Sequence, residues 1–161
     1  TSAITYQQIR AKLLKLKAKG KDIGIIVIDY LQIMGGLDAN NLVNSLAEIT
    51  GALKGLAKEF DCPIILLSQL NRDLEKRPNK RPINSDLRSS GSIEQDADII
   101  MFIYRDEVYN ENSDQKGVAE VIIGKNRHGA IGTVRLGFDG AKSKFSDFIL
   151  QYDEDCNQFH D

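Results

Sequence analysis

An acidic residue directly follows the most apolar segment of this chain. Residues 25–28 are Ile-Ile-Val-Ile, and Asp29 comes next. Four branched apolar residues in a row predict a strand that is buried on both faces. Because ligands of open α/β sheets bind beyond the carboxyl ends of the strands, Asp29 is expected at a ligand-binding edge. Its carboxylate could hold Mg²⁺ there against the phosphates of a nucleotide. The alternative is an aspartate that only caps the next helix.

A neutral amide follows a second apolar segment. Residues 64–67 are Ile-Ile-Leu-Leu, and Ser68 and Gln69 close the segment. If the two strands are neighbours, the Gln69 amide and the Asp29 carboxylate meet at the same edge of the sheet. An amide there can sense or polarise a terminal phosphate, or orient a water molecule, without repelling an anionic substrate. The alternative is a polar strand end that meets solvent.

Two cations lie in a short polar segment between two further apolar runs. Lys125 and Arg127 are two residues apart, so on an extended stretch their side chains point to the same face. The forked guanidinium suits phosphate oxygens, the lysine adds a compact charge, and a hairpin tip can reach a neighbouring subunit. The alternative is a solvated charged turn. We interpret His128 as a turn residue rather than a general base.

A long polar segment, residues 71–93, carries a local excess of positive charge. Five basic and two acidic residues lie in 72–81, and two prolines, Pro78 and Pro82, oppose regular structure in the segment. Gly91 and small serines such as Ser89 expose backbone amides that can donate to phosphates, which favours contact with a nucleic-acid backbone. No aromatic residue is interleaved for base stacking. A solvated, disordered loop is the alternative, and we expect the segment to lack order without DNA.

Alternating strands and helices must position these residues. Apolar spacing predicts an amphipathic helix that ends at Gly20 and a long helix over 42–60. Apolar runs predict strands at 23–29, 64–68 and 97–104. The strand–helix–strand order indicates an α/β fold with a mostly parallel sheet flanked by helices.

The last third of the chain has a different pattern. Two apolar runs, 118–123 and 132–138, enclose the short turn with the two cations and predict a carboxyl-terminal antiparallel β-hairpin. The acidic end, residues 151–161, is expected to be a frayed, disordered tail. Residues 1–150 are thus expected to form the folded part.

Composition indicates an ordinary globular chain of about one domain. The 161 residues are 42% hydrophobic and 27% charged, and the net charge of −2 means that any nucleic-acid surface must be local. Cys62 and Cys156 show no metal-ligand spacing, and Cys62 is expected as a buried thiol, which suits a reducing cytosol. No apolar run approaches the roughly 18 residues of a membrane span. The chain does not begin with Met, and we expect it to be a fragment of a longer protein.

Six short segments together form a more specific pattern than any one of them. They are Ile28-Asp29-Tyr30-Leu31-Gln32, Leu67-Ser68-Gln69-Leu70-Asn71-Arg72, Gly91-Ser92-Ile93-Glu94-Gln95-Asp96-Ala97-Asp98, Tyr104-Arg105-Asp106-Glu107, Gly124-Lys125-Asn126-Arg127 and Gly132-Thr133-Val134. In this order they closely resemble the carboxyl-terminal motor domain of bacterial replicative DNA helicases of the DnaB family. The similarity covers nearly the whole chain, from about Thr1 to Phe148. A phage or prophage relative is equally compatible.

The resemblance implies a RecA-like P-loop NTPase core, present here as a partial domain. It implies a ring-shaped homo-hexamer that holds ATP and Mg²⁺ between adjacent subunits and translocates 5′→3′ on single-stranded DNA. It also implies primase and a helicase loader as partners, and a place in the bacterial cytoplasm rather than at a membrane.

The resemblance also assigns a role to each polar position of the nucleotide site. Asp29 matches the second-motif acid that serves Mg²⁺, and Gln69 matches the residue that reports the γ-phosphate to the DNA loops. Lys125 and Arg127 match the basic pair that reaches the ATP of the neighbouring subunit, with Arg127 as the arginine finger.

Three positions match the family's contacts to the DNA backbone: Arg72, Ser89 and Gly91. Relatives usually carry Glu at position 89. Ser89 preserves a contact through its main-chain amide but not one that needs a carboxylate.

The phosphate-loop motif GxxxxGK[ST] does not occur in this chain, because Asp22 follows Gly20-Lys21 and Asn126 follows Gly124-Lys125. In the family, this loop and the catalytic glutamate precede the matched region. The 161 residues alone are therefore predicted neither to bind ATP tightly nor to hydrolyse it. Two alternatives remain: a RecA-like recombinase or clock-type ATPase, or a non-catalytic module that binds single strands or a loader protein.

Overall fold

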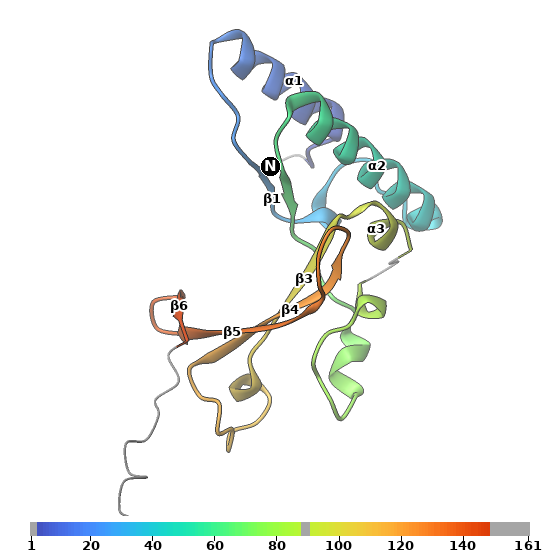
Figure 1. Ribbon diagram of the computed structural model, residues 1–161. Helices are drawn as coiled ribbons and strands as arrows, with labels where there is room; N and C mark the ends of the chain where they lie inside the picture. The colour runs from blue at the N-terminus through green and yellow to red at the C-terminus, as the bar shows by residue number, and fades with distance from the viewer. Residues whose placement is uncertain (1–2, 88–90, 149–161) are drawn as a thin grey trace, which may run out of the picture.

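The chain folds into helices over a small parallel sheet and a longer antiparallel arm (Figure 1). The structure is a computed structural model that describes residues 3–87 and 91–148. Strands β1 (Ile26–Ile28) and β2 (Ile64–Leu66) pair in parallel, and a second sheet has the strand order β3-β4-β5-β6. These observations confirm the predicted α/β class, with a parallel sheet and an antiparallel hairpin.

The β1–α2–β2 unit sets the position of the two polar strand ends. Helix α2 (Leu42–Phe60) has the predicted bounds and ends at Asp61, which adopts a left-handed conformation with φ of 49°. Helix α1 (Tyr6–Ala18) begins with a capping box between Thr5 and Gln8. Gly20, with φ of 70°, follows its end as predicted. The apolar faces of both helices join Ile26 and Ile28 in one core, which holds β1 firmly against them.

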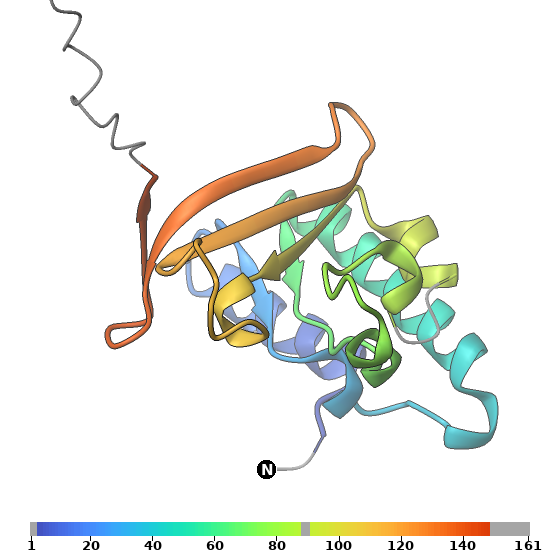
Figure 2. The same cartoon turned by 90° about the horizontal axis from the view of Figure 1, so that it is seen from below.

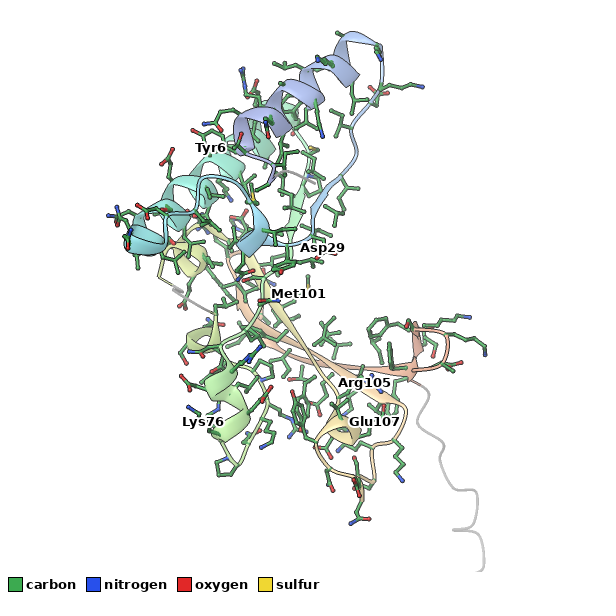
Figure 3. The ribbon with its side chains drawn as sticks, turned by 180° about the vertical axis from the view of Figure 1, so that it is seen from behind. Tyr6, Asp29, Lys76, Met101, Arg105 and Glu107 are labelled. Carbon is green, nitrogen blue, oxygen red and sulfur yellow. The ribbon has the colours of Figure 1, made fainter. Side chains whose placement is uncertain are left out.

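The prediction that β1 is buried on both faces is wrong for the described part of the chain. Ile26 and Ile28 face the helices, but Val27 is 59% exposed. Side chains alternate across a strand, and α1, α2 and the short helix α3 (Gly91–Asp96) all contribute to the core on one face. The opposite face of β1 and β2 therefore exposes apolar side chains, namely Ile25, Val27, Ile65 and Leu67. Residues 99–104 alternate in the same way and expose Ile99, Met101 and Ile103; Met101 is labelled in Figure 3.

The predicted hairpin is confirmed and is longer than expected. Strands β4 (Val118–Asn126) and β5 (Gly132–Asp139) pair with each other, β3 (Ile99–Tyr104) pairs with β4, and an unpredicted β6 (Lys144–Asp147) extends the sheet. The turn between β4 and β5 lies beside α3, and from there the two strands extend away from the helices toward β6 (Figures 1 and 2). The β3–β4 register shifts beside Gly124, where an added Cβ would meet the Phe102 ring at 2.7 Å.

The expectation that residues 71–93 lack order is wrong for residues 71–87 and for residues 91–93, which begin α3. Two 3₁₀ turns lie in this segment, η3 (Arg72–Lys76) and η4 (Asn84–Asp86). A third, η5 (Asp106–Val108), follows β3. Figure 3 shows Lys76 and Glu107 on the two loops that flank β3. Helix α3 was also not predicted. The two prolines lie outside these turns and therefore do not prevent them.

Two of the five cations in residues 72–81 form bidentate ion pairs: Arg77 closes the loop on itself, and Arg81 holds the loop to β4. Arg77 donates to both carboxylate oxygens of buried Asp86, at 3.0 and 2.8 Å. Arg81 donates to both oxygens of buried Glu120 on β4, at 2.7 and 2.8 Å, and stacks on the Tyr104 ring. Such bidentate ion pairs fix the orientation of both side chains. These cations are therefore structural, which reduces the charge available to a nucleic acid.

Cys62 is a buried free thiol in the core, as predicted. No helix within residues 3–87 and 91–148 is long and apolar enough to cross a membrane. The predicted tail at 151–161 lies outside the described residues.

Candidate functional site

Asp29 and Gln69 lie at the same edge of the parallel sheet. β1 and β2 pair in register from Ile26 with Ile64 to Ile28 with Leu66, so both chains leave the sheet at their carboxyl ends together. Asp29 is the first residue after β1, and Figure 3 shows it at the end of that strand. Both side chains are exposed. The parallel pairing of β1 and β2 therefore places the acid and the amide at one edge of the sheet, as predicted.

Hydrogen bonds join the two segments beyond the strand ends. The Leu67 N–H donates to the Ile28 carbonyl at 3.0 Å, and the Leu31 N–H donates to the Leu67 carbonyl at 2.9 Å. Gln32 completes the link, because its amide donates to Ser68 Oγ at 3.0 Å and accepts from the Gln69 N–H at 3.3 Å. This positioning role for Gln32 was not predicted, since nothing in its local spacing separates it from an ordinary loop residue.

The donor set at this edge suits Mg²⁺ better than a metal that needs an all-protein cage. Within the described residues, no group of three or more His, Cys, Asp or Glu side chains could enclose an ion. Mg²⁺ is usually held by one or two carboxylates, several waters and the phosphates of a substrate. The single exposed carboxylate of Asp29 fits that pattern. When bound, the ion would neutralise charge on the phosphate oxygens.

Lys125 and Arg127 reach the same place, as their spacing predicts, but that place is in their own subunit. The Lys125 ammonium donates to the carbonyl of Glu94, and an Arg127 guanidinium N–H donates to the carbonyl of Gln95 at 3.0 Å. Arg127 also lies 3.5 Å from the Asp98 carboxylate. No hydrogen bond or ion pair among the described residues joins either cation to Asp29 or Gln69. The acid–amide edge and the cationic hairpin are thus separate features of one chain.

Asp98 forms an ionic cluster beneath the hairpin turn. It pairs with Lys54 on α2 as well as with Arg127. The hydrogen bond from Lys54 holds the pKa of Asp98 below its usual value, and the nearby charge of Arg127 lowers it further. Asp98 therefore stays ionised, which favours the seating of the guanidinium. His128, the residue after Arg127, lies in the turn and is exposed, consistent with its interpretation as a turn residue.

The three predicted DNA-contact positions differ in what the structure describes. Arg72 begins the 3₁₀ turn η3 and is exposed, with no ion-pair partner among the described residues. Gly91 is the exposed first residue of α3. Ser89 lies outside the described residues. Arg72 and Gly91 are therefore accessible, whereas Arg77 and Arg81 of the same basic segment are engaged in ion pairs.

The parallel sheet, the helices that cover it and the antiparallel arm define the chain as part of a RecA-like domain. Residues 1–147 match the family described as the DnaB-like helicase C terminal domain. The chain belongs to this family.

Comparisons with individual proteins agree with this assignment. The chain is 55% identical over 153 residues to the replicative DNA helicase DnaB of Buchnera aphidicola and 54% identical over 154 residues to that of Pasteurella multocida. These alignments cover 94% and 95% of this chain but 33% of each relative, so the chain spans about a third of their length.

Solved structures give the same result. One solved structure, described as an ATPase domain, has a TM-score of 0.85 and 42% identity, and the match covers 91% of this chain and 52% of that one. A structure of a DnaB-like replicative helicase, described with its interactions with primase, has a TM-score of 0.86 and 42% identity, with 92% and 36% covered.

Proposed function

We propose that this chain is the carboxyl-terminal part of the motor of a hexameric replicative DNA helicase. The motor would use ATP and Mg²⁺ to move 5′→3′ along single-stranded DNA and unwind the duplex ahead of it. The observation that carries the proposal is the shared carboxyl edge of β1 and β2, from which Asp29 and Gln69 both emerge. Such an edge is where parallel α/β sheets bind nucleotides. Membership of the DnaB-like family supports the same function.

In this proposal the nucleotide site is shared between two subunits. Asp29 of one subunit holds Mg²⁺, and Gln69 contacts the γ-phosphate or the attacking water. Lys125 and Arg127 of the adjacent subunit approach the same phosphates from the other side and stabilise the charge that develops during phosphoryl transfer. The separation of cations and acid within one subunit is consistent with this arrangement, since neither cation bonds to Asp29 or Gln69 in the described residues.

The DNA would pass the exposed residues of the 71–93 segment. We propose that Arg72 contributes a charge and that Ser89 and Gly91 contribute main-chain donors to backbone phosphates. Such contacts carry no sequence information, as a replicative motor requires. A ring of six copies, primase and a loader are the proposed protein partners, and the proposed location is the bacterial cytoplasm.

The 161 residues alone are predicted to be inactive as an ATPase. A phosphate loop supplies successive backbone N–H groups and a lysine around the β- and γ-phosphates, and no such motif occurs in this chain. We expect the purified chain to show no ATP hydrolysis above a buffer blank, and no saturable binding of a fluorescent ATP analogue at micromolar concentration. Hydrolysis by the isolated chain that disappears in its Asp29→Asn variant would contradict this.

The proposed function is tested by replacing the edge carboxylate in the full-length protein. Asp29→Asn keeps the size of the side chain but removes its charge, so ATP turnover should fall by about 100-fold or more as Mg²⁺ is lost or misplaced. Unwinding of a duplex with a 5′ single-stranded tail should stop with it. Asp22→Asn is the matched control, since Asp22 is an exposed aspartate before the amino end of β1. Equal activity of the two variants would exclude the proposed role of Asp29.

A further inference from the structure

The two finger cations are held in their own subunit by the end of a very short helix. Helix α3 has six residues, and its last carbonyls have no partners within the helix. The Lys125 ammonium binds the carbonyls of Glu94 and Gln95, and Arg127 binds the carbonyl of Gln95. The negative end of a helix favours cations. The carbonyls of Glu94 and Gln95 at the carboxyl end of α3 thus form a binding site for both side chains, which we call the seat.

A neutral side chain from the preceding loop fastens this seat to the hairpin. Asn84, in the turn η4, donates through its Nδ2 to the Glu94 carboxylate at 2.9 Å and to the Gly124 carbonyl at 3.2 Å. Gly124 directly precedes Lys125. One amide therefore links the last turn of α3 to β4, which carries Lys125 and leads into the turn with Arg127. Neither Asn84 nor Glu94 belongs to the nucleotide or DNA sites described above.

The opposite end of α3 is one of the proposed DNA contacts. Gly91 is the first residue of the helix, and Glu94 and Gln95 lie only three and four residues later. A helix of this length spans about 9 Å, so a contact at its first residue and the cations at its last turn belong to one short rigid body. A movement or rotation imposed at Gly91 is therefore passed to the seat.

We propose that the carboxyl end of α3, fastened by Asn84, is a resting seat that withholds Lys125 and Arg127 from the neighbouring nucleotide until DNA engages Gly91. This inference rests on the proposed function and adds its regulation. These bonds hold both side chains against their own subunit, and an N–H that is bound to a carbonyl cannot donate to a phosphate at the same time. The seat therefore competes with the neighbour's ATP, and weakening the seat should favour the active arrangement without DNA. Asn84 and Glu94 act through the cations and are positioning residues.

The test uses the full-length hexamer and compares ATP turnover with and without single-stranded DNA. Asn84→Asp is nearly isosteric but replaces the donor with an acceptor, so both of its bonds are lost. Losing these bonds should raise the DNA-independent kcat by at least about fivefold, with KM for ATP and the DNA-saturated kcat unchanged. The ratio of stimulated to basal turnover should fall by the same factor.

Two further variants separate this effect from general damage. Glu94→Gln is the matched control, because its amide oxygen can still accept from Asn84, and it should keep the wild-type ratio. The double variant Asn84→Asp with Glu94→Gln restores a bond between positions 84 and 94 with the donor reversed, and should recover most of the ratio. An unchanged ratio in Asn84→Asp, a lower basal rate, or no recovery in the double variant would overturn the seat. Absence of DNA-stimulated turnover in the unmutated protein would instead count against the proposed function.

Discussion

Replacing Arg127 with alanine is expected to lower ATP turnover by the assembled ring at least about 1,000-fold, the low end for an arginine supplied to phosphoryl transfer by a neighbouring subunit. The guanidinium has two parallel donors that suit the equatorial oxygens of a transferring phosphoryl group. Steady-state ATPase assays on rings of verified size provide the measurement. Arg135→Ala is the control, because Arg135 is an exposed arginine on β5 of the same hairpin; it should leave turnover within about twofold.

Mixing two inactive variants gives the sharper test of a shared site. Subunits with Arg127→Ala keep Asp29, and subunits with Asp29→Asn keep Arg127. In randomly mixed rings about one interface in four combines an intact acid with an intact finger, by the geometry of a head-to-tail ring. Activity should therefore return on mixing. If the mixture stays as inactive as each variant alone, acid and finger do not act across one interface.

Replacing Arg81 with alanine is expected to lower the free energy of unfolding by about 3 kcal/mol, because it leaves the buried Glu120 carboxylate without its partner. Glu120 is 5% exposed and receives both Arg81 bonds in the middle of the β3–β4–β5 sheet. The loss should also free residues 77–83 from the sheet. Thermal unfolding followed by circular dichroism measures the stability, and amide hydrogen exchange in β4 locates the change.

A surface pair on α1 and α2 is a matched comparison. Arg10 binds both oxygens of Glu59 with similar geometry, but both side chains are accessible to solvent. Solvent screens such pairs, so Arg10→Ala should change stability little. If Arg10→Ala lowers the free energy of unfolding as much as Arg81→Ala does, then the burial of Glu120 does not explain the effect of Arg81→Ala.

Local patterns in the sequence were sufficient to locate the acid–amide edge. The apolar run before Asp29, the second run before Gln69 and the helical spacing over 42–60 between them are all short-range signals. They predict a strand–helix–strand unit, whose parallel pairing places both polar ends at one edge. The two-residue spacing of Lys125 and Arg127 likewise predicted a common face, and both side chains meet at Gln95. The order of six motifs added the family, which the comparisons confirm.

The partners of the charged residues were decided by tertiary structure alone. Arg81 and Glu120 are 39 residues apart, and no local rule pairs them or distinguishes Arg81 from exposed Arg72. The same holds for the order of residues 71–87, which depends on such pairs, and for the seat of Lys125 on α3. The burial of only one face of β1 also depends on which elements cover the sheet. Periodicity describes neighbours along the chain, whereas an ion pair or a covered face depends on where distant segments meet in space.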